Sequence, residues 1–305
     1  AAAGLFLATA LGGILFVTAR PGVLRIAVES ASADARIVEG IARVLTRERS
    51  PVRLSLTLVD QGQAEALLKG GGVDLATVRS DTMSADSLAI AALRKSALFI
   101  WTAHLSSQKT TRITEWKNLA GSKIAMLNGS PADLALLNVV LSSEGVPLNK
   151  IEIVPIGSVD AMASDKGINV FATVGAIKSK AIAEEFRSFS RFREAPAFLG
   201  LETAEAIVLA QPRLEALEIP KSAFRSNPAL PPEPTRVIAV SDLIVGRQAT
   251  SEQAVASLAR ELFAHRQTLL QAHSSGHVQL QHAAVVRRKV HASGDEPCLK
   301  DQPPR

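Results

Sequence analysis

The chain has 305 residues, of which 47% are hydrophobic and 21% charged, which excludes a chain that is disordered throughout and a membrane protein with many spans. Its formal net charge is +5, but it has only 10 Phe, 2 Trp and no Tyr, so a nucleic-acid surface of alternating basic and aromatic residues is poorly supported. The single cysteine, Cys298, can close no internal disulfide and excludes a zinc knuckle.

The first stretch, Ala1 to Ala19, has no charged side chain and is followed at once by Arg20. An apolar segment of this length can cross a bilayer as a helix, and Val17-Thr18-Ala19 has the small-residue pattern of a signal cleavage site. We therefore predict an apolar helix over residues 1–20 that serves as a signal peptide or membrane anchor. Both interpretations place the body of the protein in the periplasm, anchored to the inner membrane through residues 1–19 if the segment is retained.

Strands and helices alternate from Leu24 onward, because apolar residues recur with period two and then with helical spacing. The first series is predicted as strand 24–28, a helix to about residue 45, strand 52–59, helix 64–69, strand 73–78 and two strands at 87–93 and 97–103. The second series is predicted as strand 123–127, helix 131–142, strand 151–155, helix 160–165, strand 169–174 and helix 179–186.

After the second series, residues 227–235 are rich in proline and are predicted as a linker, followed by a strand over 236–240 and a helix over 251–270. The return of a strand indicates that the chain crosses back to its first lobe. We expect an α/β fold with two parallel-rich sheets and a ligand cleft between the lobes. The predicted lobe I comprises 22–104 and 236–271, lobe II comprises 105–226, and 272–305 is an atypical tail expected to be poorly ordered.

Enzyme signatures are absent from the sequence: it has no GxxxxGK[ST], HExxH, GxSxG or GxGxxG motif. Cys298 lies in the predicted tail and is interpreted as an incidental thiol. His273, His277 and His282 have no carboxylate at ligand spacing, so we predict no metal site. The sequence thus predicts a protein that is not an enzyme, with no catalytic residue and no cofactor.

Polar residues cluster where predicted strands meet predicted helices, at Ser30 to Arg36, Arg79 to Asp81, Asn128 to Ser130 and Val174 to Ser179. Hydroxyls and free amides at a helix N-terminus favour an anion, and the two arginines can each grip a carboxylate. The plainer interpretation is that the serines only cap helices. Several such junctions in one two-lobed chain favour a shared ligand cleft.

The order of these motifs resembles the solute-binding receptors of tripartite ATP-independent periplasmic (TRAP) transporters, TAXI subtype. The resemblance spans about residues 24–270, and its best stretches are the opening strand with its serine-rich loop, GGVDLATVRSD (71–81), NLAGSKIA (118–125) and residues 174–185. It implies a type II periplasmic-binding fold that closes on a small organic anion, such as a dicarboxylate or amino acid, and delivers it to membrane permease subunits.

Carried over by position, the resemblance implies ligand contacts at Ser30, Ser32, Asp34, Arg36, Arg79, Ser80, Asn128, Gly129, Ser130, Val174 and Gly175. Relatives often carry Gly-Gly-Thr-Tyr-Tyr where this chain has Ser32 to Arg36, so an aromatic cover over the ligand is missing. This departure leaves an alternative function: a membrane-anchored sensory or partner-binding module with lost or altered solute binding. Neither hypothesis includes a nucleic-acid partner.

Overall fold

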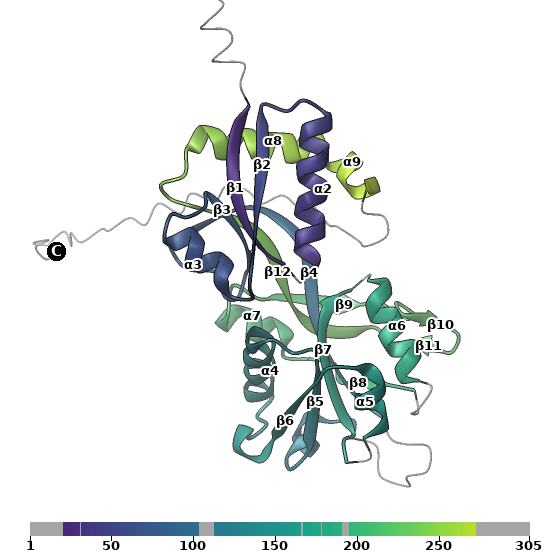
Figure 1. Ribbon diagram of the computed structural model, residues 1–305. Coiled ribbons are helices and arrows are strands. Elements are labelled where there is room, and N and C mark those ends of the chain that lie inside the picture. Colours follow the sequence, from purple (N-terminus) through teal and green to yellow (C-terminus); the bar gives the residue numbers. More distant parts are fainter. Residues whose placement is uncertain are drawn as a thin grey trace, which may run out of the picture.

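The computed structural model describes residues 21–30, 32–103, 113–165, 167–177, 179–190 and 195–272. These residues form an α/β protein with two lobes, one above the other in Figure 1. The predicted N-terminal helix over 1–20 and the tail from residue 273, with Cys298 and the three histidines considered above, lie outside the described residues. Within the described ranges, no helix is long and apolar enough to cross a membrane.

The described strands, in chain order, are β1 (Gly22–Glu29), β2 (Val52–Val59), β3 (Leu75–Arg79), β4 (Ser87–Thr102), β5 (Lys123–Leu127), β6 (Glu152–Ile156), β7 (Val170–Ala176), β8 (Ala197–Phe198), β9 (Glu215–Ile219), β10 (Arg225–Ser226), β11 (Ala229–Leu230) and β12 (Thr235–Arg247). The described helices are α2 (Ala33–Arg47), α3 (Gln63–Lys69), η1 (Trp116–Leu119), α4 (Pro131–Ser143), η2 (Leu148–Lys150), α5 (Val159–Ser164), α6 (Lys180–Phe189), α7 (Ala204–Ala210), α8 (Glu252–Ala264) and α9 (Arg266–Ala272).

The main sheet is continuous through both lobes, so the expectation of two separate sheets was wrong. Its strands run in the order β2-β1-β3-β12-β4-β7-β5-β6, with β8 added to β4 and β9 added to β12. The strands at the two ends of the sheet are parallel to their neighbours. At one end β1 pairs in parallel with β2 and β3, and at the other β5 pairs in parallel with β6 and β7. The centre is antiparallel because β12 pairs with both β3 and β4, and β4 pairs with β7.

Two long strands, β4 and β12, pass from one lobe to the other and explain why the sheet is not divided. The sequence predicted β4 as two strands, at 87–93 and 97–103, and β12 as a short strand at 236–240. The structure has one strand of 16 residues and one of 13. The charged pair Arg94-Lys95 does not break β4, because β12 supplies hydrogen bonds along it and carboxylates neutralise both side chains.

A polar belt interrupts both crossing strands at the same level and separates the hydrophobic cores of the two lobes. It consists of Arg94, Lys95 and Ser96 in β4 and of Ser241 and Asp242 in β12, with Asp242 opposite Arg94 and Ser241 opposite Lys95. The apolar residues before the β4 part of the belt pack in the first lobe, and those after it pack in the second. The pairing of the strands shifts register directly after Asp242.

Helix starts in the described structure follow the capping signals of the sequence. At α2, the Ser32 hydroxyl accepts a hydrogen bond from the Ala35 amide at 3.2 Å. At α4, Ser130 and Asp133 form a capping box, with Pro131 in the first turn. The helix predicted over 251–270 is instead divided at His265, where φ −98° and ψ 11° depart from helical values.

The core of the second lobe contains a cluster of aromatic rings built around Phe186 of α6. Its ring centroid lies 5.0 Å from that of Trp101 and 4.9 Å from that of Phe224. Phe99, Phe171, Phe189 and Phe198 complete the cluster. Most of the chain's few aromatic residues therefore stabilise this lobe.

Residues 204–230 contain elements that the sequence reasoning did not predict. Helix α7 and strand β9 occupy 204–219, and β9 pairs with the first half of β12. The short strands β10 and β11 form an antiparallel pair within 225–230, where the predicted proline-rich linker begins.

Candidate functional site

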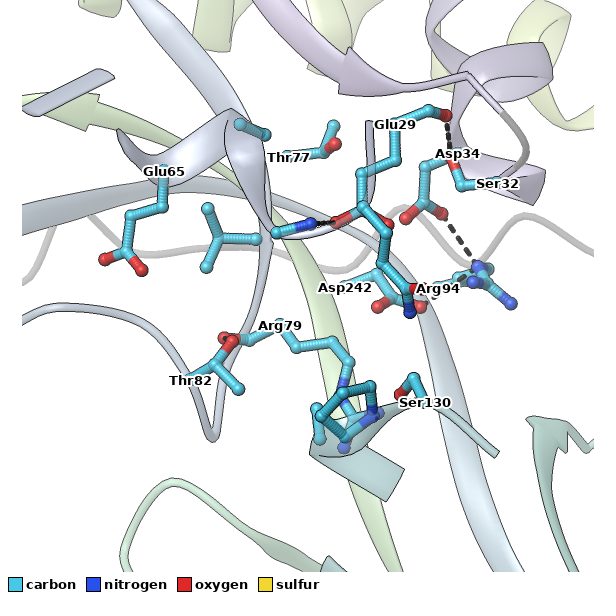
Figure 2. Close-up of a pocket in the computed structure, with 16 residues that line it drawn as sticks. Glu29, Ser32, Asp34, Glu65, Thr77, Arg79, Thr82, Arg94, Ser130 and Asp242 are labelled. Atoms are coloured by element: carbon cyan, nitrogen blue, oxygen red, sulfur yellow. Dashed lines mark hydrogen bonds and ion pairs between the residues drawn. The ribbon is translucent and has the colours of Figure 1, made fainter. Parts of the chain in front are cut away.

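A cavity of about 550 Å³ lies between the two lobes at the carboxyl ends of β1 and β3. The first lobe and the polar belt supply most of the lining, and the N-terminus of α4 in the second lobe supplies the rest (Figure 2). The size is within the range of small-molecule sites. The lining residues are Glu29, Ser32, Asp34, Gln61, Gly62, Ala64, Glu65, Thr77, Val78, Arg79, Thr82, Arg94, Ser130, Pro131, Ala132 and Asp242.

Arg94 lies in the cavity between two buried carboxylates. Its Nε atom is 2.8 Å from Asp34 Oδ1 and 3.0 Å from Asp242 Oδ2. The Ser96 hydroxyl also donates to Asp242 Oδ2, at 3.3 Å. Asp34 is 8% exposed and Asp242 is 4% exposed, so one guanidinium forms ion pairs with two buried carboxylates.

The pKa of Asp242 is raised from 3.8 to about 7 because burial disfavours its ionised form and the Asp34 carboxylate repels it. Arg94 and Arg79 oppose this rise through their positive charges. The pKa of Arg94 is itself raised by the two carboxylates, which outweigh the effect of its burial. Arg94 therefore stays charged, and burial beside Asp34 favours the protonated form of Asp242.

Arg79, at the end of β3, is held by two carboxylates from different parts of the chain. Its Nε and Nη2 atoms donate to the two oxygens of Asp81 at 3.0 and 2.7 Å, and Nη1 forms an ion pair with Asp133 of α4. Asp133 also accepts hydrogen bonds from the amide and hydroxyl of Ser130. The Arg79–Asp133 pair thus joins the first lobe to the second across the cavity.

Glu29 and Glu65 add two further carboxylates from the first lobe. Glu29 Oε1 accepts a hydrogen bond from the Gly62 amide at 2.7 Å. Glu65 Oε1 accepts from the Ser84 amide at 2.7 Å and lies 3.6 Å from Lys69 Nζ. Figure 2 shows Glu29 and Glu65 on the same side of the cavity as Thr77.

The sequence-predicted site residues divide into two groups. Ser32, Asp34, Arg79 and Ser130 line the cavity, and the structure brings them together from three elements or their ends. All four side chains have partners within the protein. Both serines cap helices, Asp34 is paired with Arg94, and Arg79 is paired with Asp81 and Asp133.

The other predicted residues are not among the residues that line this cavity. Ser30 lies in an exposed turn, Arg36 is exposed on α2, and the Ser80 hydroxyl bridges the Arg213 carbonyl and the Ser241 amide. Asn128 has a positive φ of 48°, in the turn between β5 and α4.

Three of the predicted residues have close-packed backbone positions instead. At Gly129, a Cβ atom would lie 2.5 Å from Met126 Cγ. At Gly175, a Cβ atom would lie 2.4 Å from Ile182 Cδ1, so this glycine lets α6 pack against β7. Val174 pairs with Leu98 inside the sheet. These positions have a structural role in the described arrangement.

The sequence reasoning missed the polar belt and, apart from Asp34, the acidic residues of the cavity. Arg94 and Asp242 each interrupt an apolar strand, and a charged residue inside a buried strand was the available signal. Glu29 ends β1, as expected for a ligand residue in an open sheet. No signal in the sequence marked Glu65 or Thr82. Among the described residues, no group of His, Cys, Asp and Glu could hold a metal ion.

Comparisons with known proteins give one family match and several similar solved structures. Residues 54–190 match the family described as NMT1/THI5 like, which is somewhat less than half of the chain. No curated protein matches the sequence. The structure of YCKB from Bacillus subtilis is similar with a TM-score of 0.51 at 11% identity, covering 86% of this chain and 94% of that one.

Two further solved structures are similar at lower scores. The periplasmic aliphatic sulphonate binding protein SsuA of Escherichia coli has a TM-score of 0.45 at 13% identity, covering 83% of this chain and 73% of that one. The second substrate-binding domain of GlnP from Lactococcus lactis has a TM-score of 0.44 at 12% identity, covering 84% and 95%. The chain has a two-lobed α/β fold, as predicted, and the structure of YCKB is similar to it.

Proposed function

We propose that this protein is an extracytoplasmic receptor that captures a small polar solute and presents it to a membrane transporter. The observation that carries the proposal is the cavity of about 550 Å³ between the two lobes, which the paired strands β4 and β12 connect. A cavity at the carboxyl ends of sheet strands is where ligands bind in open α/β folds. The residues of the polar belt that line it, Arg94 and Asp242, belong to these crossing strands.

Recognition requires no chemical step in this proposal. A solute that contacts both walls of the cavity stabilises the closed arrangement of the lobes, and the transporter distinguishes that arrangement from the open one. The Arg79–Asp133 ion pair connects the two walls. Solute binding must therefore add to this contact or replace it.

The resemblance to the TAXI subtype supports a TRAP-type secondary transporter as the partner, with a periplasmic location and permease subunits in the inner membrane. An ATP-driven importer uses the same receptor fold, so the fold does not choose between them. Affinity purification of the full chain from membranes separates the hypotheses. A large permease without an ATPase supports the TRAP type, an ATPase subunit contradicts it, and a signalling kinase supports the sensory module.

The solute expected from the sequence is a small organic anion, a dicarboxylate or an amino acid, gripped by arginine. The pairing of Arg79 with Asp81 and Asp133 weakens the case for a dicarboxylate, because a second anion would have to compete with both. The receptor function itself does not depend on the charge of the solute.

Native mass spectrometry of the purified full chain, combined with small-angle scattering, tests the receptor function. We expect a co-purified small molecule, and a smaller radius of gyration when the solute is added back after its removal. A protein that carries no small molecule and shows no thermal shift with a broad set of anionic, zwitterionic and cationic metabolites would contradict the proposal.

A further inference from the structure

The charges around the cavity are predominantly negative, although the chain as a whole is basic. Four carboxylates line the cavity: Glu29, Asp34, Glu65 and Asp242. Asp81 and Asp133 add two more, which are bound to Arg79. In the part of the chain that the structure describes, Arg79, Arg94 and Lys69 are the residues that form ion pairs with these six carboxylates.

The two arginines offer little positive charge to a ligand. Arg79 has a carboxylate on each side, and Arg94 lies between Asp34 and Asp242. The side chains of Arg79 and Arg94 are 17% and 21% exposed, so the ion pairs are shielded from most of the solvent. Charges interact more strongly where water is excluded, so an anion placed here would be repelled by the surrounding carboxylates.

The carboxylates, in contrast, have unused capacity for a cation. Asp34 and Asp242 share a single guanidinium, and Glu29 accepts a hydrogen bond from the uncharged Gly62 amide. A buried carboxylate without a full counter-charge is costly, and a positive ligand group would supply the missing charge. The hydroxyls of Thr77 and Thr82 and the amide of Gln61 also line the cavity and provide further hydrogen-bond acceptors.

The kind of cation follows from the lining. None of the described lining residues is aromatic, so the cavity lacks the ring faces that hold quaternary ammonium groups. Carboxylate and hydroxyl oxygens instead favour a cation that donates N–H hydrogen bonds. The volume of about 550 Å³ accommodates a small aliphatic molecule.

We propose that this cavity binds a small organic cation carrying a primary ammonium or guanidinium group, and that dicarboxylates are not its ligands. The inference rests on the proposed receptor function and names the class of its solute. Glu29 and Glu65 on the first-lobe wall and the Asp34–Asp242 pair at the polar belt are the acceptors for that group.

Three four-carbon probes that differ mainly in charge test the proposal by calorimetry on the full chain. These are butane-1,4-diamine, 4-aminobutanoate and succinate, with 4-guanidinobutylamine as a guanidinium probe. We expect at least one of the two cations to bind at least about tenfold more tightly than succinate. The preference should shrink at high ionic strength, because the attraction is electrostatic.

Conservative variants locate the binding group. Glu29→Gln and Glu65→Gln keep an oxygen that can accept from the Gly62 and Ser84 amides, so both should fold. Each should weaken binding of the cation about tenfold or more. Glu39→Gln changes an exposed residue of α2 outside the cavity and should leave affinity unchanged. Melting temperatures of all variants confirm that they are folded.

The outcomes separate this inference from the receptor function. Tighter binding of succinate than of either cation would overturn the inference and leave the receptor function standing. Binding of a cation that is equally strong in wild type, Glu29→Gln and Glu65→Gln would also overturn it, because the cation would then bind elsewhere. No binding of any probe, together with no co-purified solute, would overturn both proposals.

Discussion

The substitution Asp242→Asn should remove a pH dependence from the stability of the folded protein. Burial and the Asp34 carboxylate raise the pKa of Asp242 to about 7 in the folded state, against 3.8 for an ordinary aspartate. Between these two values the folded state holds a proton that the unfolded state has lost. The free energy of unfolding therefore falls as the pH rises through this window, and becomes level above about pH 7.

The size of the effect follows from the two pKa values. One unit of pKa difference corresponds to about 1.4 kcal/mol, so ionisation of Asp242 lowers the free energy of unfolding by about 2 kcal/mol between about pH 5.5 and pH 8. Asparagine has nearly the same shape and is neutral, and Arg94 keeps Asp34 as its partner. We therefore expect residue 242 of the variant to add nothing to the difference in the free energy of unfolding between these two pH values.

Urea denaturation at several pH values, followed by tryptophan fluorescence and circular dichroism, measures the difference. Coincident curves from the two probes justify a single free energy. The groups that face Asp242 are Asp34 from α2, Arg94 and Ser96 from β4 and Arg79 from β3. Asp34→Asn should shift the window to lower pH, because the repulsion that raises the pKa is removed. An Asp242→Asn protein with the same pH slope as wild type would refute the reasoning.

Three further variants test other parts of the structure. Phe186→Ala should lower the free energy of unfolding by about 3–5 kcal/mol in urea denaturation because it removes a ring from the centre of the aromatic cluster, whereas Phe263→Ala, at a half-exposed ring, should cost far less. Ser130→Ala should cost about 0.5–2 kcal/mol by breaking the capping box of α4, and a loss equal to that of Ser142→Ala in the same helix would contradict the role. Glu185→Gln should reduce the fall in thermal stability towards pH 8, because burial raises the pKa of Glu185 to about 7, and an unchanged pH profile would contradict it.

Local signals in the sequence were sufficient for most elements of the fold. The helix start at Ser130 followed from its capping residues, and Ser32 was one of three candidate caps for α2, with Ser30 and Asp34. The strands of the first lobe followed from hydrophobic periodicity. Such signals act over a few residues, so they also misled where a charged pair interrupts an apolar run. The sequence predicts a break between two strands at Arg94. Its neutralising partners, Asp34 and Asp242, are distant in the sequence, so no local signal shows that the strand continues.

The site was predicted less well for the same physical reason. A serine or glycine near the end of a strand suits a ligand contact, a helix cap or close packing equally well. At Gly175 the role is close packing against Ile182. Asp242 lies opposite Arg94 only because β12 returns through the sheet antiparallel to β4, in a register that the sequence does not display. The acidic character of the cavity therefore emerges only when the strands are placed side by side.

Folding and the binding of the inferred cation favour different protonation states of Asp242. Ionised Asp242 destabilises the folded protein because it is buried and lies beside the Asp34 carboxylate, but it is the form that attracts a cation. A bound cation should therefore lower the pKa of Asp242 and release a proton below about pH 7. Calorimetry with butane-1,4-diamine in two buffers of different ionisation enthalpy measures that proton. Its release should disappear in Asp242→Asn. Cation binding at about pH 6 with no proton released would show that the positive group does not approach the polar belt, and would place it with Glu29 and Glu65 alone.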